Sequence, residues 1–203
     1  MKILGLTGPS GAGKGEVGAL LRARGLAVID TDRVYHDLLI PPSPCLDALV
    51  EAFGHHILAT DGTLDRATLA ALVFADTDEA RARHEVLNRI THRFVTERTS
   101  ELLHSVRAEG YRAAVIDAPL LLEAGMDAMC EAVIAVIADR EVRLGRLLTR
   151  DNKSREALIA RLDAQPDDMF YRERAQFVIV NDGTLAELER AVDAVLTALG
   201  GEI

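Results

Sequence analysis

Tryptophan is absent from this sequence of 203 residues, and aromatic residues make up only 4% of it. Aliphatic side chains and alanine must therefore fill the core, because 49% of the residues are hydrophobic. Only two cysteines occur, Cys45 and Cys130, far apart and in no CxxC pattern, so we expect neither a disulfide framework nor a cysteine-built zinc site. The length favours one domain with a sizeable core.

Positively charged residues are also few: 23 Lys and Arg residues stand against 32 Asp and Glu residues, which gives a net charge of −9. Nucleic acids and anionic membranes are bound by cationic surfaces, so this balance argues against both kinds of partner. Any phosphate site must then be a local arrangement of donors, and the expected partners are small molecules.

Long hydrophobic runs are missing as well. The longest apolar stretch, residues 132–138, is far shorter than the roughly 20 residues that span a membrane. The apolar residues 3–6 near the start are too few for the hydrophobic region of a signal peptide. We therefore expect a soluble, cytoplasmic protein.

Short apolar runs alternate with longer amphipathic stretches along the chain. Five brief runs, rich in β-branched residues, predict buried strands at 3–7, 27–30, 113–117, 133–138 and 177–181. Helical patterns occupy 15–24, 66–74, 78–109, 140–150, 154–164 and 185–199, and the proline-rich residues 41–44 predict a turn between helices. Strands alternating with helices indicate a doubly wound α/β fold with a five-stranded parallel sheet.

A glycine-rich loop follows the first predicted strand and precedes a predicted helix. Its sequence, Gly8-Pro9-Ser10-Gly11-Ala12-Gly13-Lys14, has the G-x-x-x-x-G-K form of a P-loop. Glycines let consecutive backbone N–H groups wrap a β-phosphate, the lysine reaches the β and γ oxygens, and the helix start adds partial positive charge. A tight turn that binds no phosphate is the structural alternative.

The two residues after the lysine depart from the usual P-loop. Gly15 stands where a Ser or Thr normally binds Mg²⁺, and Glu16 follows it. A carboxylate suits the first turn of a helix but repels phosphate oxygens. Three hypotheses stay open: Glu16 turns away, it meets the phosphates through Mg²⁺, or it weakens nucleotide binding.

Carboxylates follow two of the predicted strands, at the edge where open α/β sheets bind ligands. Asp117 fits a metal-supporting acid that acts directly or through water, and Asp32 is placed to accept a proton from an attacking hydroxyl. Each carboxylate has a second interpretation as a helix cap, Asp32 at the next helix and Asp117 at a helix starting near Pro119. The two roles are compatible.

Together these residues resemble the dephospho-CoA kinase family over almost the whole chain. The matching segments come in the family's order, at residues 8–14, 28–32, 53–54, 61–66, 69, 74, 90–92, 119–123, 146, 150–151, 164–165, 175 and 178–183. Departures are Gly15 and Glu16, Arg93 in place of proline, Gln176 in place of an acid, and the acidic Asp167 and Asp168 in the lid.

The resemblance implies a P-loop kinase with strand order 2-3-1-4-5, in which residues 32–111 form a helical acceptor-binding insertion and residues 150–176 a lid. It implies transfer of the γ-phosphate of ATP to the ribose 3′-hydroxyl of dephospho-CoA, with Mg²⁺. Asp32, Lys14 and Arg146 would be catalytic, and Asp117 would support the metal. The expected ATP-binding residues are Gly8, Gly11, Ala12, Gly13, Lys14, Gly15, Glu16, Arg150, Asn181 and Gly183. The expected acceptor-binding residues are Asp32, Arg66, His92, Pro119 and Leu120.

Two alternatives remain at this point. The loop, including Gly15, is as similar to that of cytidylate-type monophosphate kinases, although the later segments are not. A nucleotide- or CoA-binding regulatory protein on the same fold, with little turnover, is the second alternative.

Overall fold

The computed structural model describes residues 1–200, and its strands form one parallel sheet. The strands are β1 (Lys2–Thr7), β2 (Ala27–Asp30), β3 (Ala113–Asp117), β4 (Ala132–Ile137) and β5 (Phe177–Val180). Their order is β2-β3-β1-β4-β5, which confirms the expected topology. Leu4 pairs with Val115 on one side of β1 and with Ala132 on the other.

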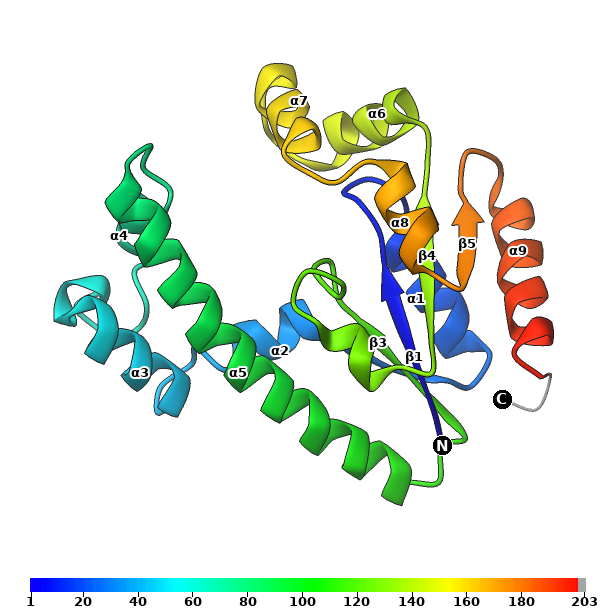
Figure 1. Cartoon of the computed structure of the whole chain (residues 1–203), viewed down its shortest axis with the longest axis horizontal. Helices are drawn as coiled ribbons and strands as arrows, with labels where there is room; N and C mark the ends of the chain where they lie inside the picture. The colour runs from blue at the N-terminus through cyan, green and yellow to red at the C-terminus, as the bar shows by residue number, and fades with distance from the viewer. Residues whose placement is uncertain (201–203) are drawn as a thin grey trace. The chain divides into compact units, whose positions relative to one another are not determined.

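Helices connect the strands and build a second compact unit (Figure 1). They are α1 (Lys14–Ala23), α2 (Thr31–Asp37), α3 (Pro44–Phe53), α4 (Arg66–Val73), α5 (Asp78–Ala108), α6 (Arg140–Arg150), α7 (Arg155–Asp163), α8 (Asp168–Arg174) and α9 (Leu185–Ala198), with 3₁₀ turns η1 (His55–Ile57) and η2 (Met126–Met129). One unit contains Met1–Asp30 and the chain from Leu103 onward, and the other contains Thr31–Leu102.

The sheet is covered on both faces, as a parallel sheet requires. On one face Leu6 and Ile134 pack with side chains of α1 and α9, such as Val17 and Val192. On the other face Ala135 and Ile137 pack with Tyr171 of α8. The alternation along β4 thus gives each face its own core. Because both faces of the sheet are covered, most side chains of the strands are apolar, and the strands appear in the sequence as continuous apolar runs.

The helical unit has a core of its own. Leu49 of α3, Ile57 of η1 and Leu69 of α4 are buried together with Leu87 of α5. Ser43 caps α3 by accepting a hydrogen bond from the N–H of Leu46, and Pro44 occupies the first helical position. The predicted turn at residues 41–44 is therefore confirmed, since α2 ends at Asp37 and α3 begins at Pro44.

One expected helix is missing. The segment after β3 forms successive turns at residues 119–125 and becomes helical only in η2 at Met126, so the helix start predicted near Pro119 is wrong. Leu121 is completely buried here, and a Cβ on Gly5 would lie 2.4 Å from its Cδ2 atom. Packing of this side chain over the glycine of β1 takes the place of a regular helix.

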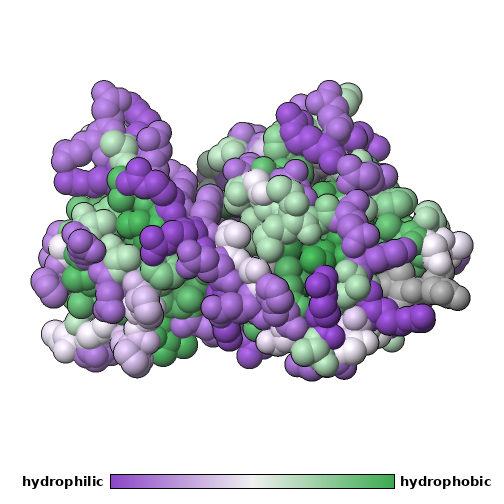
Figure 2. Space-filling view, turned by 60° about the horizontal axis from the view of Figure 1, so that its bottom comes forward, coloured by the Kyte–Doolittle hydropathy of each residue, from purple (hydrophilic) through white to green (hydrophobic). Residues whose placement is uncertain are grey.

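The surface is mostly hydrophilic. Figure 2 shows hydrophilic residues over most of the projecting parts of one face, with hydrophobic residues between them. Among the helices of residues 1–200, none is both long enough and apolar enough to span a membrane.

Candidate active site

The glycine-rich loop joins β1 to α1, and its glycines adopt conformations that other residues rarely reach. Gly11 and Gly13 have φ of 80° and 96°. A Cβ on Gly8 would lie 2.0 Å from the carbonyl oxygen of Val136, and a Cβ on Gly13 would lie 2.1 Å from Nδ2 of Asn181. The loop therefore needs glycine at these positions, as the P-loop motif predicts. Gly13 is the N-cap of α1 and brings no capping side chain, which leaves the helix start to a ligand.

Side chains from elsewhere in the same unit hold the carbonyl oxygens of the loop. Arg146 of α6 donates to the carbonyls of Gly11 and Ala12, both at 3.3 Å, and to that of Asn181 at 2.9 Å. The buried Nδ2 of Asn181 donates to the carbonyl of Ala12 at 2.8 Å. Arg146, expected to be catalytic, and Asn181, expected to bind ATP, thus fix the shape of the glycine-rich loop.

A third residue that holds the loop, Gln165, comes from the segment between α7 and α8. Gln165 accepts a hydrogen bond from the N–H of Ser10 at 3.0 Å and donates one to Ser10 Oγ at 3.1 Å. The carboxamide thereby pairs with the N–H and with the hydroxyl oxygen of one loop residue. Sequence reasoning named Gln165 only as part of the resemblance and missed this contact, because the two residues lie 155 positions apart.

Lys14 and Asp117 form an ion pair and hydrogen bond at the edge where β3 ends. The Asp117 side chain is only 8% exposed, so this carboxylate is largely shielded from water. Since residues 119–125 form turns and no helix begins directly after β3, the interpretation of Asp117 as a helix cap is wrong. The carboxylate instead holds the lysine whose ammonium group the P-loop motif assigns to the β and γ phosphates.

Beside the loop lies a cavity of about 510 Å³, within the size range of small-molecule sites. It is lined by Gly11, Gly13, Glu16, Gly145, Arg146, Leu147, Thr149 and Arg150. Oε2 of Glu16 lies 3.3 Å from the position that a Cβ on Gly13 would take, so its carboxylate does not turn away from the loop.

Arg150 lines the same cavity and carries its own anionic partner. Its Nε donates to Asp151 at 2.7 Å. This hydrogen bond raises the pKa of the Arg150 guanidinium, and the nearby charge of Glu16 acts in the same direction. Gly183 follows β5 and sits against Glu187 of α9, whose Oε2 would lie 2.2 Å from an added Cβ.

The residues fit a nucleotide better than they fit an isolated metal ion. The loop offers glycines at a helix start that has no side-chain cap, and one lysine, which is the donor set for phosphates. Among residues 1–200 no group of three or more His, Cys, Asp or Glu side chains could hold a metal. A Cβ on Gly15 would meet no atom within 4 Å, so space is left where a hydroxyl ligand usually stands. Mg²⁺ is commonly bound by one or two carboxylates with substrate phosphates and water, and Asp117 suits that mode.

The expected acceptor residues fall on both units. Pro119 accepts a hydrogen bond from Thr7 Oγ1 at 3.2 Å through its carbonyl, and the neighbouring Leu120 is 53% exposed. In the helical unit Asp32 lies in the first turn of α2. Arg66 Nη2 is 2.8 Å from Nδ1 of His36.

His92 of α5 is half-buried, and burial lowers the pKa of its imidazole below the ordinary value of 6.5. It therefore favours the neutral form and can donate or accept a hydrogen bond at neutral pH.

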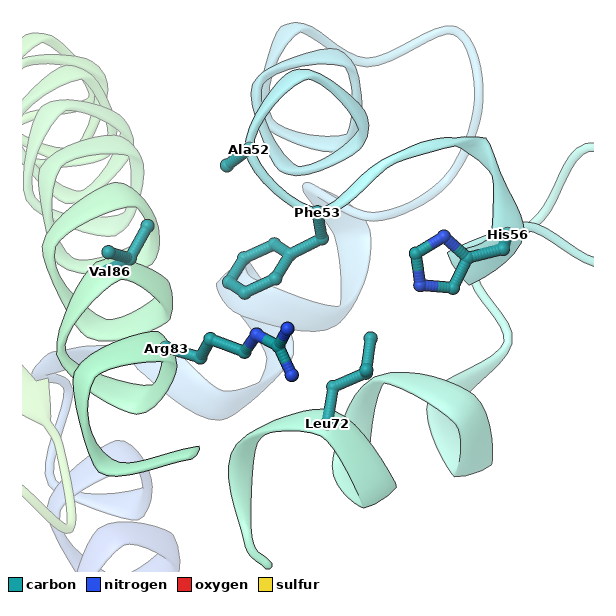
Figure 3. A pocket seen from close by; sticks show the side chains of 6 residues that line it. All are labelled: Ala52, Phe53, His56, Leu72, Arg83 and Val86. Carbon is teal, nitrogen blue, oxygen red and sulfur yellow. The ribbon is translucent and has the colours of Figure 1, made fainter. Parts of the chain in front are cut away.

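The helical unit also contains a small cavity of about 160 Å³. Figure 3 shows the guanidinium of Arg83 from α5 extending between Phe53 and Leu72, with the ring of His56 beyond them. Arg83 is held by Glu79 at 2.7 Å one helical turn away. Its positive charge is therefore largely compensated within α5.

The parallel sheet of order β2-β3-β1-β4-β5 and the glycine loop with its lysine define a P-loop kinase, a class of phosphotransferase that binds a nucleotide. The model of the dephospho-CoA kinase family matches residues 2–187. The chain belongs to the dephospho-CoA kinase family.

Individual relatives agree with this assignment. A dephospho-CoA kinase of Moorella thermoacetica is 42% identical over 195 residues, which covers 96% of this chain and 90% of the relative. The crystal structure of TT1252 from Thermus thermophilus is similar with a TM-score of 0.82 and 34% identity, over 98% of both chains. Shikimate kinase from Bacteroides thetaiotaomicron shares the fold alone, with a TM-score of 0.53 and 16% identity over 98% of each chain.

Proposed function

We propose that this protein transfers the γ-phosphate of ATP to the ribose 3′-hydroxyl of dephospho-CoA, giving coenzyme A and ADP. The observation that carries the proposal is the glycine-rich P-loop, held by Arg146, Asn181 and Gln165, in a chain of this family. Bound Mg²⁺ would neutralise charge on the phosphate oxygens, and Asp117 is the residue that would support it.

The nucleotide site is assigned to the loop and the cavity beside it. The N–H groups of Gly11, Gly13, Lys14 and Gly15 would surround the β-phosphate, with the Lys14 side chain turned toward the β and γ oxygens. Arg146 keeps the loop in shape, and Arg150 and Glu16 would line the path of the nucleoside. Asn181 and Gly183 complete this side of the site through the backbone after β5.

Asp32 is proposed as the base of the reaction. It follows β2 by two residues, at the end of the sheet where open α/β folds bind their ligands. The 3′-oxygen forms a bond to the γ-phosphorus, the bond from that phosphorus to the β–γ bridging oxygen breaks, and the hydroxyl proton passes to the Asp32 carboxylate. Arg66, His92, Pro119 and Leu120 are proposed to bind the acceptor, and residues 150–176 to act as a lid that excludes water.

The test is an assay of ADP release with dephospho-CoA, with CMP and without an acceptor. We expect turnover with dephospho-CoA alone, and a product whose new phosphate is on the 3′-oxygen by ³¹P NMR. Turnover with CMP alone would show a monophosphate kinase instead. Tight ATP binding without turnover on either acceptor would show a regulatory protein.

A further inference from the structure

Arg143 of α6 is a buried cation, and two of the three nitrogens of its guanidinium lack a hydrogen-bond partner in the described part of the chain. The residue is only 8% exposed, and among residues 1–200 its Nε and Nη1 atoms are buried and have no hydrogen-bond partner. The other arginines of α6 differ. Arg140 is paired with Asp163 at 2.7 Å, Arg146 donates to three carbonyls and Arg150 is paired with Asp151. Arg143 is one of the three buried residues of α6, together with Leu144 and Leu147.

The backbone of Arg143 lies directly against the phosphate loop. A Cβ on Gly11 would be 2.8 Å from the carbonyl oxygen of Arg143 and 3.1 Å from its Cα and Cβ atoms. The side chain therefore starts at the loop itself. It does not line the 510 Å³ cavity that Arg146 and Arg150 line on the nucleoside side.

Two carboxylates share the surroundings of the Tyr171 hydroxyl with Arg143. Its charge acts on the hydroxyl of Tyr171, as do the charges of Glu123 and Asp168. Burial is the main cause that raises the pKa of Tyr171 to about 12, so this phenol stays neutral. In the described part of the chain neither carboxylate forms an ion pair with Arg143.

A guanidinium removed from water is stable only when its N–H groups are hydrogen-bonded, preferably to an anion. Arginine side chains remain charged in proteins, so this cost is relieved only by hydrogen-bond partners. Its planar set of donors matches the oxygens of a phosphate group. An unpartnered buried group of this kind is best explained by a ligand that completes it.

We propose that Arg143 is a binding residue of the nucleotide site and that its guanidinium donates to an oxygen of the terminal phosphate of the bound nucleoside triphosphate. The proposal rests on the proposed function only in that the nucleotide is ATP. It requires no acceptor, so it can be tested independently of the reaction.

The test is the substitution Arg143→Met, with nucleotide affinities measured by calorimetry and the melting temperature measured without ligand. Because only the triphosphate carries the group that Arg143 binds, we expect ATP affinity to fall by about 10- to 100-fold, the usual loss for hydrogen bonds to charged groups. ADP affinity is expected to stay within about twofold of the original protein. The melting temperature without ligand is expected to hold or rise, because an uncompensated buried charge has been removed.

Two further variants make the result decisive. Arg140→Met, on the same helix and outside the site, is expected to leave the ratio of ATP to ADP affinity unchanged. Arg143→Lys keeps the charge but loses the planar donors, so it is expected to lose part of the preference for ATP and serves if the Met variant does not fold. An unchanged ratio in the folded Arg143 variants overturns the proposal, and so does an equal loss of ATP and ADP affinity. Turnover of dephospho-CoA by the unaltered protein tests the proposed function separately.

Discussion

The carboxamide of Gln165 binds Ser10 at two atoms, accepting from its N–H at 3.0 Å and donating to its Oγ at 3.1 Å. Ser10 belongs to the phosphate loop, and Gln165 lies between α7 and α8. The position of this α7–α8 connection is therefore coupled to the conformation of the loop.

Substitution of Gln165 by Met is expected to weaken ATP binding more than substitution of Ser10 by Ala. The Met variant loses both hydrogen bonds, whereas Ser10→Ala loses only the bond to Oγ. Each contributes about 1 kcal/mol, so we expect the KM for ATP to rise by about 10- to 30-fold in the first variant and about fivefold in the second. We also expect more ADP release without acceptor in Gln165→Met, because a displaced lid admits water. Equal kinetic constants in the two variants would contradict the coupling.

Asp32→Asn is expected to lower kcat by about 10²- to 10⁴-fold, the usual contribution of a general base, with KM for ATP unchanged within about twofold. The amide cannot accept the proton of the attacking hydroxyl. The matched control is Asp37→Asn at the exposed end of the same helix, which should keep full activity. Steady-state kinetics with dephospho-CoA provide the measurement. A kcat within twofold of the original would show that Asp32 only stabilises the start of α2.

The double substitution Gly15→Ser with Glu16→Thr is expected to tighten ATP binding by about 5- to 10-fold at low salt. Glu16 lies close to Gly13, and like charges about 4 Å apart repel by about 4 kcal/mol at an effective dielectric constant of 20, before screening. The gain should shrink as salt is added. Glu16→Gln alone separates the charge from the new hydroxyls. Weaker ATP binding in that variant would mean that the carboxylate assists the nucleotide.

The stability of the protein is expected to fall as the pH drops below about 6.5, in part because of His92. Burial lowers the pKa of this imidazole in the folded state from its ordinary value of 6.5. Below that pH the unfolded chain binds a proton that the folded chain resists, so the free energy of unfolding decreases as pH falls. The contribution is at most about 1.4 kcal/mol per pH unit.

Urea unfolding between pH 5 and 7 measures this slope. His92→Gln is expected to flatten it, and the exposed control His55→Gln is expected to leave it as it is. A slope that His92→Gln does not change would assign the pH dependence to other groups.

The strands were predictable because each is a short apolar run, and β3 and β4 are buried at every residue. The bounds of β3 agree with the prediction at both ends, and the sheet order is the expected one. The helix expected at Pro119 did not form, since proline at a first helical position is only a preference. Packing of Leu121 over Gly5 decides that segment, and this contact joins residues far apart in the chain.

The candidate site was predictable where one continuous motif defines it. The motif at residues 8–14 identifies the loop and its lysine, because the backbone conformation of the loop restricts the residue types at these positions. The contacts that hold the loop were not predictable, since Gln165 and Asn181 meet it through the folding of distant segments. The burial of Arg143 could not be predicted for another reason. An arginine on an amphipathic helix ordinarily reaches water, and only the packing of α6 shows that Arg143 does not.

The carbonyls of Gly11 and Ala12 are bonded to Arg146 and Asn181 of the same unit. Contacts within the protein itself therefore hold the shape of this loop. The conformational entropy of this segment is lost when the chain folds, so ordering of the loop adds little to the cost of binding a ligand.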